Sequence, residues 1–521
     1  MSAITIKETG RVRAVKKIIA RVSGLSNFMN GQLVNFGEGS ATKGLIMGFQ
    51  EDDILVLILG EESRVRIGQE VYSVQEEFRI PVGGGFLGRI VNALGEPVDG
   101  KGPIASCVVR HASCVMRPAS CEKTQDAQRT AQDAQRIAQD TYPVFRAAPE
   151  TMDRGEADSF LETGTKIIDA IIPISNGQRQ LIIGDRMTGK TTVALDAILH
   201  QKDKDVICIY CCIGKSFSSL LKAARLLKLK AALDYTIVVA ATASATVGEQ
   251  YLSPYSAAAL AEYFMHKGRD VLLVFDDMTK HAWSYRQLSL LLERPPGREA
   301  YPGDIYYIHS QLIERAGKLN KESGGGSITL FPIIDTLQGD ITGFIPSNFI
   351  SMTDGQIYLS SALFAEGFKP AIDFTLSVSI IGAKTQNPIL KKLAANIRLE
   401  YAQYKELLRL TKLKSGLTAE AERKIRRGEA ISALLSQDKN NPASITELII
   451  LLYALDRKIL DELDMDKIVK FKNEIWGYVL KNDPELVEKL NAAKELTPEL
   501  KTELDDVLVR YFKEAGSKQQ G

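Results

Sequence analysis

The chain has 521 residues, 45% of them hydrophobic and 25% charged, and its 65 Lys and Arg nearly balance its 64 Asp and Glu, for a formal net charge of +1. One hydrophobic core rarely serves so long a chain, so the length predicts about three domains. The composition is that of a globular protein and excludes a disordered chain, which would need few apolar residues and a high net charge. It also argues against a nucleic-acid partner bound through a large overall positive charge.

The chain contains no apolar run long enough, at about 18 residues, to predict a transmembrane helix. Its first residues, MSAITIKETGRVRAVKK, lack the apolar core of a secretory signal. We therefore expect neither a signal peptide nor a transmembrane segment.

The pattern of apolar residues divides the chain into three parts. Residues 1–78 alternate short apolar runs with Gly, Asn and Asp, which is typical of a small β-barrel. Residues 79–375 alternate apolar strands with helical stretches and predict a largely parallel sheet covered by helices, an α/β domain. Residues 376–521 are mostly helical in period and predict a C-terminal α-helical domain.

A seven-residue repeat interrupts the central part at about residues 105–140 and reads ASCVVRH, ASCVMRP, ASCEKTQ, DAQRTAQ and DAQRIAQ. Its cysteines recur every seven residues, whereas structural zinc sites usually pair cysteines about two to four residues apart. Ala, Cys and Gln also supply the apolar positions of a coiled coil poorly. We interpret the repeat as a low-complexity surface insertion, with a metal clip as the alternative.

The other three cysteines, Cys208, Cys211 and Cys212, lie in the apolar run VICIYCCIG. This run predicts a buried strand, in which the cysteines would be packed free thiols.

The strongest motif is GDRMTGKT, residues 184–191, which matches G-x-x-x-x-G-K-[ST] between the strand QLIIG and the helix TTVALDAIL. Backbone N–H groups of such a loop and the positive end of the helix can hold phosphate oxygens. Lys190 can reach the β- and γ-phosphates, and the Thr191 hydroxyl can bind Mg²⁺. A chance glycine-rich turn is the alternative, but the flanking strand and helix argue against it. The predicted nucleotide-binding loop comprises Gly184, Asp185, Arg186, Met187, Thr188, Gly189, Lys190, Thr191 and Thr192.

A second acidic element fits this loop. The run RDVLLVFDD places Asp276 at the end of an apolar strand, where a carboxylate can hold Mg²⁺, partly through water. An Asp in this position is often only a helix N-cap, and Asp277 is the better candidate for that role.

Three long runs resemble the alpha subunits of rotary F-type ATP synthases: TGTKIIDAIIPISNGQRQLIIGDRMTGKTT, FDDMTKHAWSYRQLSLLLERPPGREAYPGDIYYIHSQLIERAGKL and FIPSNFISMTDGQIYL. The resemblance covers nearly the whole chain. The loop form GDRxTGKT is similar to that of alpha rather than catalytic beta subunits.

The resemblance implies a multidomain fold of N-terminal β-barrel, central RecA-like P-loop domain and C-terminal helical domain. It implies an ATP-binding (or ADP-binding), Mg²⁺-dependent subunit that itself does not turn over ATP, a regulatory part of an ion-transporting two-sector ATPase. Its partners would be three catalytic beta subunits alternating with three alpha subunits, the central-stalk gamma subunit, the peripheral-stalk delta subunit and the membrane ion channel. The location would be peripheral, on the cytoplasmic side of the cell membrane. The adenine contacts carried over from the family are Phe364, Lys369, Pro370 and Gln437.

Lys215 is a departure from this family. Beta subunits carry Gly-Glu-Arg after the strand that corresponds to VICIYCCIG and alpha subunits carry Gly-Gln-Lys, whereas this chain has Gly214-Lys215-Ser216. A protonated lysine has no acceptor, so it cannot act as a general base. We predict a catalytically silent site. A merely solvated Lys215 is the alternative structural interpretation.

The segment of Ser377, Ile380 and Lys384 also departs from the family. Alpha subunits reach the neighbouring beta site with the arginine of LSVSRVG, and this chain has Ile380 there. An arginine finger contributes about 10³ to 10⁵ in rate, so its loss predicts severe impairment unless Lys384 replaces it.

The short N-terminus lacks the amphipathic helix that docks the peripheral-stalk subunit in typical alpha subunits, which argues against firm attachment of delta. An alternative function is therefore that of a diverged paralogue in an F-type-like hexamer, with a structural, regulatory or chemomechanical role and weak ATPase activity. A self-assembling P-loop ATPase would need a catalytic Glu where this chain has Lys215.

Overall fold

The computed structural model describes residues 9–25, 29–37, 42–50, 53–60, 62–104, 140–411 and 418–517. The predicted insertion at 105–140 thus lies almost wholly outside the described residues. The chain forms two compact units, each built from two separate segments. The first comprises Met1–Arg154 and Val206–Ile328, and the second Gly155–Asp205 and Thr329–Gly521.

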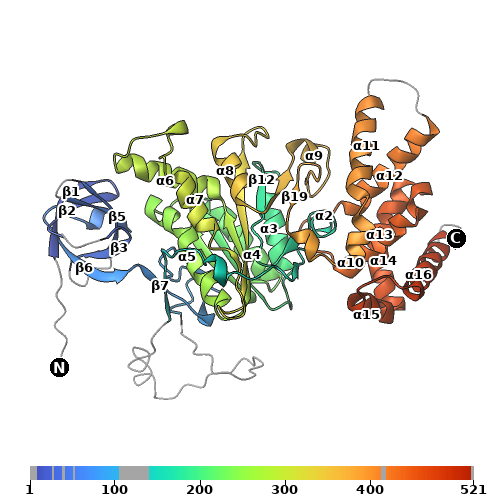
Figure 1. Ribbon diagram of the computed structural model, residues 1–521, viewed down its shortest axis with the longest axis horizontal. Helices are drawn as coiled ribbons and strands as arrows, with labels where there is room; N and C mark the ends of the chain where they lie inside the picture. The colour runs from blue at the N-terminus through green and yellow to red at the C-terminus, as the bar shows by residue number, and fades with distance from the viewer. Residues whose placement is uncertain are drawn as a thin grey trace, which may run out of the picture. The chain divides into compact units, whose positions relative to one another are not determined.

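The first unit begins with a closed barrel of six antiparallel strands, as the sequence predicted (Figure 1). Alternate apolar residues of the strands point inward and form its core, among them Val22, Phe36 and Val56. Gly44 lies where the wall is tightest, since a Cβ there would come within 2.4 Å of the Val56 side chain. In order around the barrel the strands are β1 (Thr9–Lys16), β2 (Ile19–Ser23), β5 (Asp53–Leu59), β4 (Lys43–Gln50), β3 (Gln32–Phe36) and β6 (Glu70–Glu77).

The rest of the first unit is a parallel sheet covered by helices. Strand β13 (Val206–Ile213) is apolar throughout. It is buried because β14 and β15 flank its two edges and α5 packs on it. The parallel strands are β8 (Ile90–Val91), β14 (Thr236–Ala241), β13 (Val206–Ile213) and β15 (Asp270–Asp276). The helices are α4 (Phe217–Leu229), α5 (Val247–Met265), α6 (Met278–Leu291) and α7 (Ile305–Ile313), and short strands are β7 (Arg79–Pro81), β9 (Thr141–Pro143) and β16 (Gly317–Lys318).

The three cysteines of β13, Cys208, Cys211 and Cys212, are free and buried, which confirms their predicted role as packed thiols. Burial raises the pKa of the Cys212 thiol to about 12, so that it stays protonated at neutral pH.

The second unit begins with its own parallel strands. β12 (Leu181–Asp185) lies between β17 (Ser327–Thr336) and β18 (Gly355–Leu359), and the short β19 (Val378–Ser379) adds to β18 in antiparallel direction. The parallel pairing predicted for the central part is therefore present in both units. Elements near these strands are α2 (Lys166–Ile171), α3 (Lys190–Leu199), α8 (Phe344–Met352), α9 (Ser361–Ala365), β10 (Phe160–Leu161) and β11 (Ile174–Ser175).

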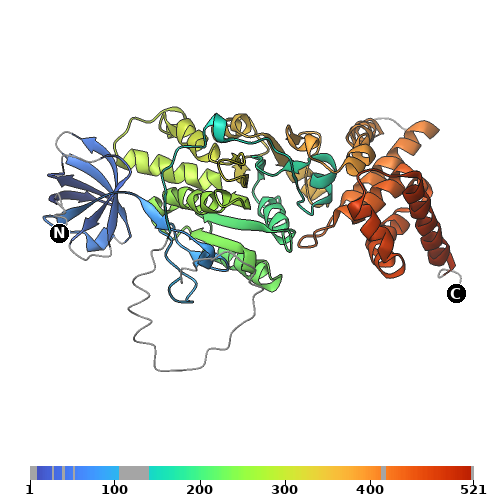
Figure 2. The ribbon, with the colours of Figure 1, turned by 60° about the horizontal axis from the view of Figure 1, so that its bottom comes forward.

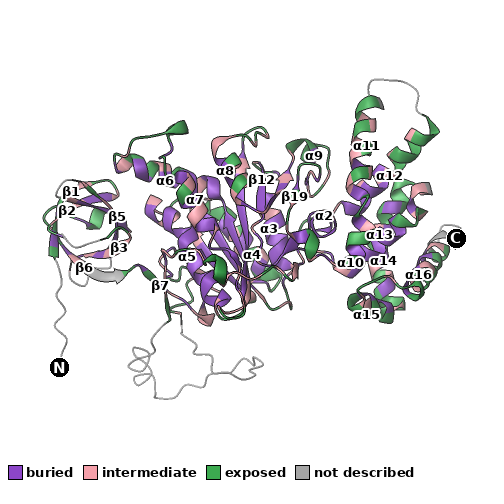
Figure 3. Cartoon of the chain, in the orientation of Figure 1, coloured by how far each residue is buried: buried purple, intermediate pink, exposed green. Residues whose placement is uncertain are grey.

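The C-terminal part of the second unit is a helix bundle, again as predicted (Figure 2). The sequence ITELIILLYALD is apolar on nearly every side, so its helix, α13, lies buried and packs on α10, α12 and α15. Figure 3 shows exposed surface on the outer faces of the surrounding helices. The bundle helices are α10 (Pro388–Ala394), α11 (Ile397–Thr411), α12 (Ala419–Leu435), α13 (Ile445–Asp456), α14 (Met465–Asn482), α15 (Pro484–Ala492) and α16 (Pro498–Ser517). Among the described residues, no helix has the length and apolar character that crossing a bilayer requires.

Candidate functional site

The P-loop motif has the strand–loop–helix setting that the sequence predicted. β12 ends at Asp185, and α3 begins at Lys190 directly after Gly189. Gly189 has a φ of 105°, a left-handed conformation that glycine adopts without strain. A Cβ on Gly184 would lie 2.4 Å from the Leu359 carbonyl oxygen of β18, so the start of the loop also requires glycine. Each of the two motif glycines is therefore required for a different structural reason.

The basic side chains of the loop converge on one carboxylate. Lys190 is 6% exposed, and its Nζ lies 3.0 Å from Oδ1 of Asp335 on β17. It also donates to the carbonyl oxygens of Gly184 and Asp185. Arg186 Nε lies 3.3 Å from Asp335 Oδ2. The cations of Lys190 and Arg186 therefore both contact the carboxylate of Asp335.

Asp185 ends β12 and has a structural role in the loop. Its carboxylate accepts hydrogen bonds from the Thr336 hydroxyl at 2.7 Å, the Gly339 N–H at 2.8 Å and the Ser361 hydroxyl at 3.1 Å. Burial alone would raise the pKa of Asp185, but these hydrogen bonds lower it overall. Asp185 thus stays ionised and ties the loop to the ends of β17 and α9.

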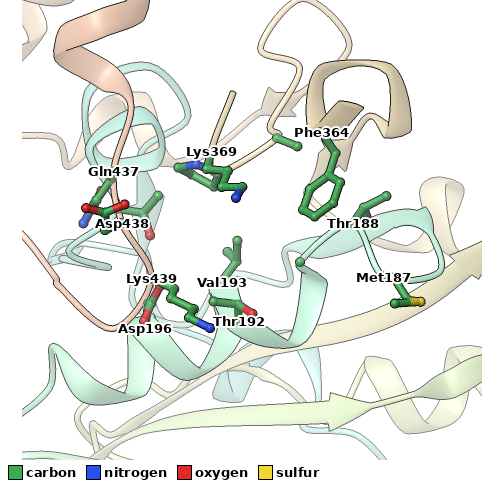
Figure 4. Close-up of a pocket in the computed structure, with 14 residues that line it drawn as sticks. Met187, Thr188, Thr192, Val193, Asp196, Phe364, Lys369, Gln437, Asp438 and Lys439 are labelled. Atoms are coloured by element: carbon green, nitrogen blue, oxygen red, sulfur yellow. The ribbon is translucent and has the colours of Figure 1, made fainter. Parts of the chain in front are cut away.

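A cavity of about 370 Å³ opens beside the loop within the second unit (Figure 4). Phe364 and Lys369 lie across the cavity from Thr192 and Val193 of α3. All four residues carried over as adenine contacts line it, together with four loop or helix residues predicted from the motif. The lining residues are Thr165, Met187, Thr188, Gly189, Thr192, Val193, Asp196, Phe364, Lys369, Pro370, Ala371, Gln437, Asp438 and Lys439.

The aromatic side of this cavity is formed by Phe364. Its side chain is 42% exposed, and the Lys369 ammonium lies 5.7 Å from the ring centroid. A half-exposed ring at the edge of a cavity can stack on a planar ligand.

Gln437 forms the opposite end of the cavity. Its amide donates to the carbonyl oxygens of Gly164 and Asn441, each at 2.7 Å, and its Oε1 accepts from the Lys166 N–H at 2.9 Å. Both amide protons are therefore engaged by the backbone, and the side chain holds the loop that follows α12. Sequence reasoning did not find its neighbours Asp438 and Lys439, or Thr165, because no motif marks them.

The acidic strand end predicted from RDVLLVFDD lies in the first unit. β15 ends at Asp276, which is fully buried, and the Tyr210 hydroxyl donates to its Oδ2 at 2.7 Å. The Lys215 ammonium forms an ion pair with Oδ1. Asp277 caps α6 by accepting from the Lys280 N–H at 2.8 Å, which confirms its predicted role.

Lys215 is held within the protein. Its side chain is 20% exposed and pairs with Asp276, so the interpretation of a merely solvated Lys215 is wrong. Burial pushes the pKa of Lys215 down, but the charge of Asp276 and its hydrogen bond outweigh this, and the pKa is raised overall. Lys215 therefore remains an ammonium at neutral pH.

The segment Ser377–Lys384 lies at the edge of the second unit's strands. Ser377 is buried: its hydroxyl donates to the Asp373 carbonyl oxygen at 2.6 Å and accepts from the Tyr358 N–H at 2.9 Å. Ile380 is 69% exposed, so it presents an apolar side chain to solvent. Lys384 is exposed and ends a short 3₁₀ helix.

Models of one protein family match most of the chain. They describe the β-barrel domain of the ATP synthase alpha/beta family at residues 5–75, its nucleotide-binding domain at 164–379 and its C-terminal domain at 386–511. Similar proteins carry the name ATP synthase subunit alpha. The one from Macrococcus caseolyticus is 43% identical over 495 residues, which cover 95% of this chain and 92% of the relative.

Two further relatives of this name extend the match. The protein from Clostridium acetobutylicum is 41% identical over 512 residues, covering 98% of this chain and 95% of the relative. The protein from Petrotoga mobilis is 40% identical over 509 residues, covering 97% of this chain and 95% of the relative. The three-part fold and these matches, which extend over nearly the whole chain, agree, and the chain therefore belongs to the family of ATP synthase alpha subunits.

Proposed function

We propose that the chain is the non-catalytic, ATP-binding alpha subunit of a rotary, ion-translocating ATP synthase. The observation that carries this proposal is the cavity that joins the P-loop residues Thr188 and Gly189 to Phe364, Lys369 and Gln437. A loop that holds phosphates and a ring that stacks on a base, in one cavity, suit a purine nucleotide. Domain boundaries at residues 78 and 375 are part of this proposal. The matched ranges of the family models end at residue 75 for the barrel and at residue 379 for the nucleotide-binding domain.

The nucleotide, ATP or ADP, would lie along the N-terminus of α3. Backbone N–H groups from Arg186 to Thr192 would bind phosphate oxygens, and Lys190 would leave Asp335 to contact the terminal phosphates. Phe364 would stack on the adenine between Pro370 and the Gln437 loop. The bound triphosphate would then replace Asp335 as the partner of two cations.

The sequence motifs suggest the Thr191 hydroxyl and, partly through water, the Asp276 carboxylate as ligands of Mg²⁺, an ion that prefers hard oxygen donors. Both ligands come from the motifs described above. Mg²⁺ would supply positive charge that offsets the charge of the phosphates. The Asp276 carboxylate also forms an ion pair with the Lys215 ammonium.

The chain's own site would not hydrolyse ATP. Lys215 follows the strand end at which catalytic relatives place a carboxylate, and an ammonium cannot accept a proton from water. Its role in an ATPase complex would be regulatory, through nucleotide binding and contacts with other subunits.

The relatives' name, ATP synthase subunit alpha, supports partners that are other subunits of such a complex. Three catalytic beta subunits would alternate with three copies of this chain around a gamma stalk, and the membrane ion channel would complete the complex, with this chain peripheral on the cytoplasmic side of the membrane. The peripheral-stalk delta subunit would not be firmly attached. Co-purification with the beta subunit of the same organism, followed by mass measurement, tests the assembly. A hexamer of both chains supports the proposal, and a chain that never binds beta overturns it.

Ile380 favours a second candidate, a diverged subunit of a hexamer with weak ATPase activity. Its exposed side chain lies where the family's arginine finger is expected, and only Lys384 lies near in sequence as a replacement cation. Hydrolysis by the assembled complex, native against Ile380→Arg, separates the two. A gain of about 10³-fold or more would favour the diverged subunit, whereas normal native activity with little gain would favour a working synthase.

A further inference from the structure

The Gln437 side chain has no proton left to donate to a base in the cavity. Its amide donates to the Gly164 and Asn441 carbonyl oxygens, and its Oε1 accepts from the Lys166 N–H. A side-chain amide has only two N–H donors, and both are used here by the backbone. Selection between purine bases must therefore come from other groups at this end of the cavity.

Asp438 and Lys439 are the charged side chains that follow Gln437. Both line the cavity and both are exposed. Figure 4 shows Asp438 next to Gln437, and Lys439 beside Asp196 of α3. Neither side chain forms a hydrogen bond or an ion pair within the described part of the chain. Burial lowers the pKa of Lys472 on α14, and the charge of Asp438 opposes this shift only in part.

The backbone on either side of these two charged residues is held in place. The Gln437 N–H donates to the Lys369 carbonyl oxygen at 2.7 Å, and the Asn440 N–H donates to Asp196 Oδ1 at 2.9 Å. Asn440 has a φ of 60°, a left-handed conformation that asparagine adopts more readily than most residues. The two residues between these points are therefore positioned before a ligand binds, which lowers the entropy lost on binding.

A carboxylate next to an ammonium matches the hydrogen-bonding edge of guanine better than that of adenine. Guanine has O6 as an acceptor and N1–H and N2–H₂ as donors, whereas adenine has N1 as an acceptor and N6–H₂ as a donor. The Asp438 carboxylate can accept two hydrogen bonds from guanine but one from adenine. The Lys439 ammonium, which has only donors, can contact O6 of guanine or N1 of adenine. Stacking on Phe364 suits either base, since every base has a π-face.

We propose that this cavity accepts guanine nucleotides at least as well as adenine nucleotides, with Asp438 and Lys439 as the residues that recognise guanine. The inference rests on the proposed function, which assigns a purine nucleotide to the cavity. ATP and GTP carry the same triphosphate and ribose, so a difference between their affinities reports the base alone.

The test is isothermal titration calorimetry of the full-length chain with ATP, GTP and inosine triphosphate at one Mg²⁺ concentration. We expect the dissociation constant of GTP to be no larger than that of ATP. Inosine triphosphate keeps O6 and N1–H but lacks the N2 amino group, so it should bind about tenfold more weakly than GTP, the loss expected for one hydrogen bond to a charged acceptor.

Variants of Asp438 show whether the preference acts through its carboxylate. Asp438→Ala should weaken GTP more than ATP, because guanine loses two hydrogen bonds and adenine one, and GTP and inosine triphosphate should then bind equally. Asp438→Glu keeps the carboxylate and should bind GTP better than Asp438→Ala does. Asp506→Ala, which removes an exposed carboxylate from α16, is the control and should leave all three affinities unchanged.

The native chain alone already decides the proposal if Asp438→Ala fails to fold, as judged by circular dichroism. A GTP dissociation constant larger than that of ATP, or equal binding of GTP and inosine triphosphate, would overturn guanine recognition while leaving the proposed nucleotide site intact. A native chain that binds none of the three nucleotides would overturn the proposed function itself.

Discussion

The Lys190 ammonium lies 3.0 Å from the Asp335 carboxylate, so the P-loop cation pairs with a side chain of β17. Lys190 is also almost completely buried and donates to two loop carbonyl oxygens. Its charge is therefore held in place and largely desolvated, and hydrogen bonds from a charged donor are stronger than those between neutral groups.

Lys190→Gln should weaken ATP binding at least about tenfold, because the variant loses the buried cation that we propose contacts phosphate oxygens. Calorimetric titration of the full-length chain measures the change. Lys489→Gln on α15 removes an exposed lysine from the bundle and should leave affinity unchanged. An unaltered dissociation constant for Lys190→Gln would show that the motif does not bind phosphate.

Phe364→Ala should lower ATP affinity by about 1–3 kcal/mol, the range found when an aromatic ring that stacks on a base is removed. Phe364→Tyr keeps the ring and should bind nearly as well as native. Phe49→Ala, which removes an exposed ring from the barrel strand β4, is the control for general effects. If Phe364→Ala binds ATP as tightly as Phe49→Ala, the base lies elsewhere.

Removing one partner of the buried pair of Arg315 and Glu262 should strongly destabilise the first unit. Arg315 Nε and Nη2 lie 2.7 Å and 2.9 Å from the two Glu262 oxygens, and Nη1 donates to the Val144 carbonyl oxygen at 2.8 Å. Arg315→Met leaves a buried carboxylate without its partner and should cost about 3–5 kcal/mol of unfolding free energy.

Urea unfolding in a Trp476→Phe background measures this change, because Trp283 of α6 is then the only tryptophan of the chain. Adding Glu262→Leu to Arg315→Met removes the stranded charge and should restore part of the lost stability. If the double variant is less stable than Arg315→Met alone, by the amount that Glu262→Leu costs in the native chain, the two residues do not stabilise the first unit as a coupled pair.

His281 should make the first unit sensitive to acid. Burial lowers the pKa of His281 to about 4, below its ordinary value of 6.5, while its ring stacks on Tyr251 and faces His309. Between these two values the unfolded chain binds more protons than the folded one, so stability is lost as pH falls from 6.5 to about 4. The shift corresponds to about 3 kcal/mol.

Urea unfolding of the same tryptophan background at several pH values tests this. Between pH 6.5 and 4, His281→Gln should lose less free energy of unfolding than native. Burial also lowers the pKa of His309, which should cause the loss that remains. His266→Gln, a histidine at the end of α5, is the control. If the free energy of unfolding falls equally with pH in native and His281→Gln, His281 is not the source of the acid sensitivity.

Short-range sequence patterns predicted the P-loop, the barrel and the helix bundle, because each of these features depends on residues that are close together in the chain. The P-loop depends on residues within one strand, loop and helix, so its setting could be read from spacing alone. The barrel and bundle follow from apolar period, which reflects burial of each element's own face.

Local sequence patterns could not predict contacts between segments that are distant in the chain. Lys215 meets Asp276 because β13 lies beside β15 in the sheet, and strand order is not encoded in local spacing. Asp438 and Lys439 reach the cavity through a loop that Gln437 ties to Gly164, a contact between distant segments. Sequence reasoning placed Gln437 at the adenine but could not show that its amide protons are already used.

Phosphate release by the purified full-length chain alone, at ATP concentrations that calorimetry shows to saturate it, tests most directly whether the chain binds ATP without hydrolysing it. We expect saturable binding that Lys190→Gln weakens, together with no phosphate release above that of the Lys190→Gln variant. Steady release by the native chain alone that Lys190→Gln abolishes would contradict it.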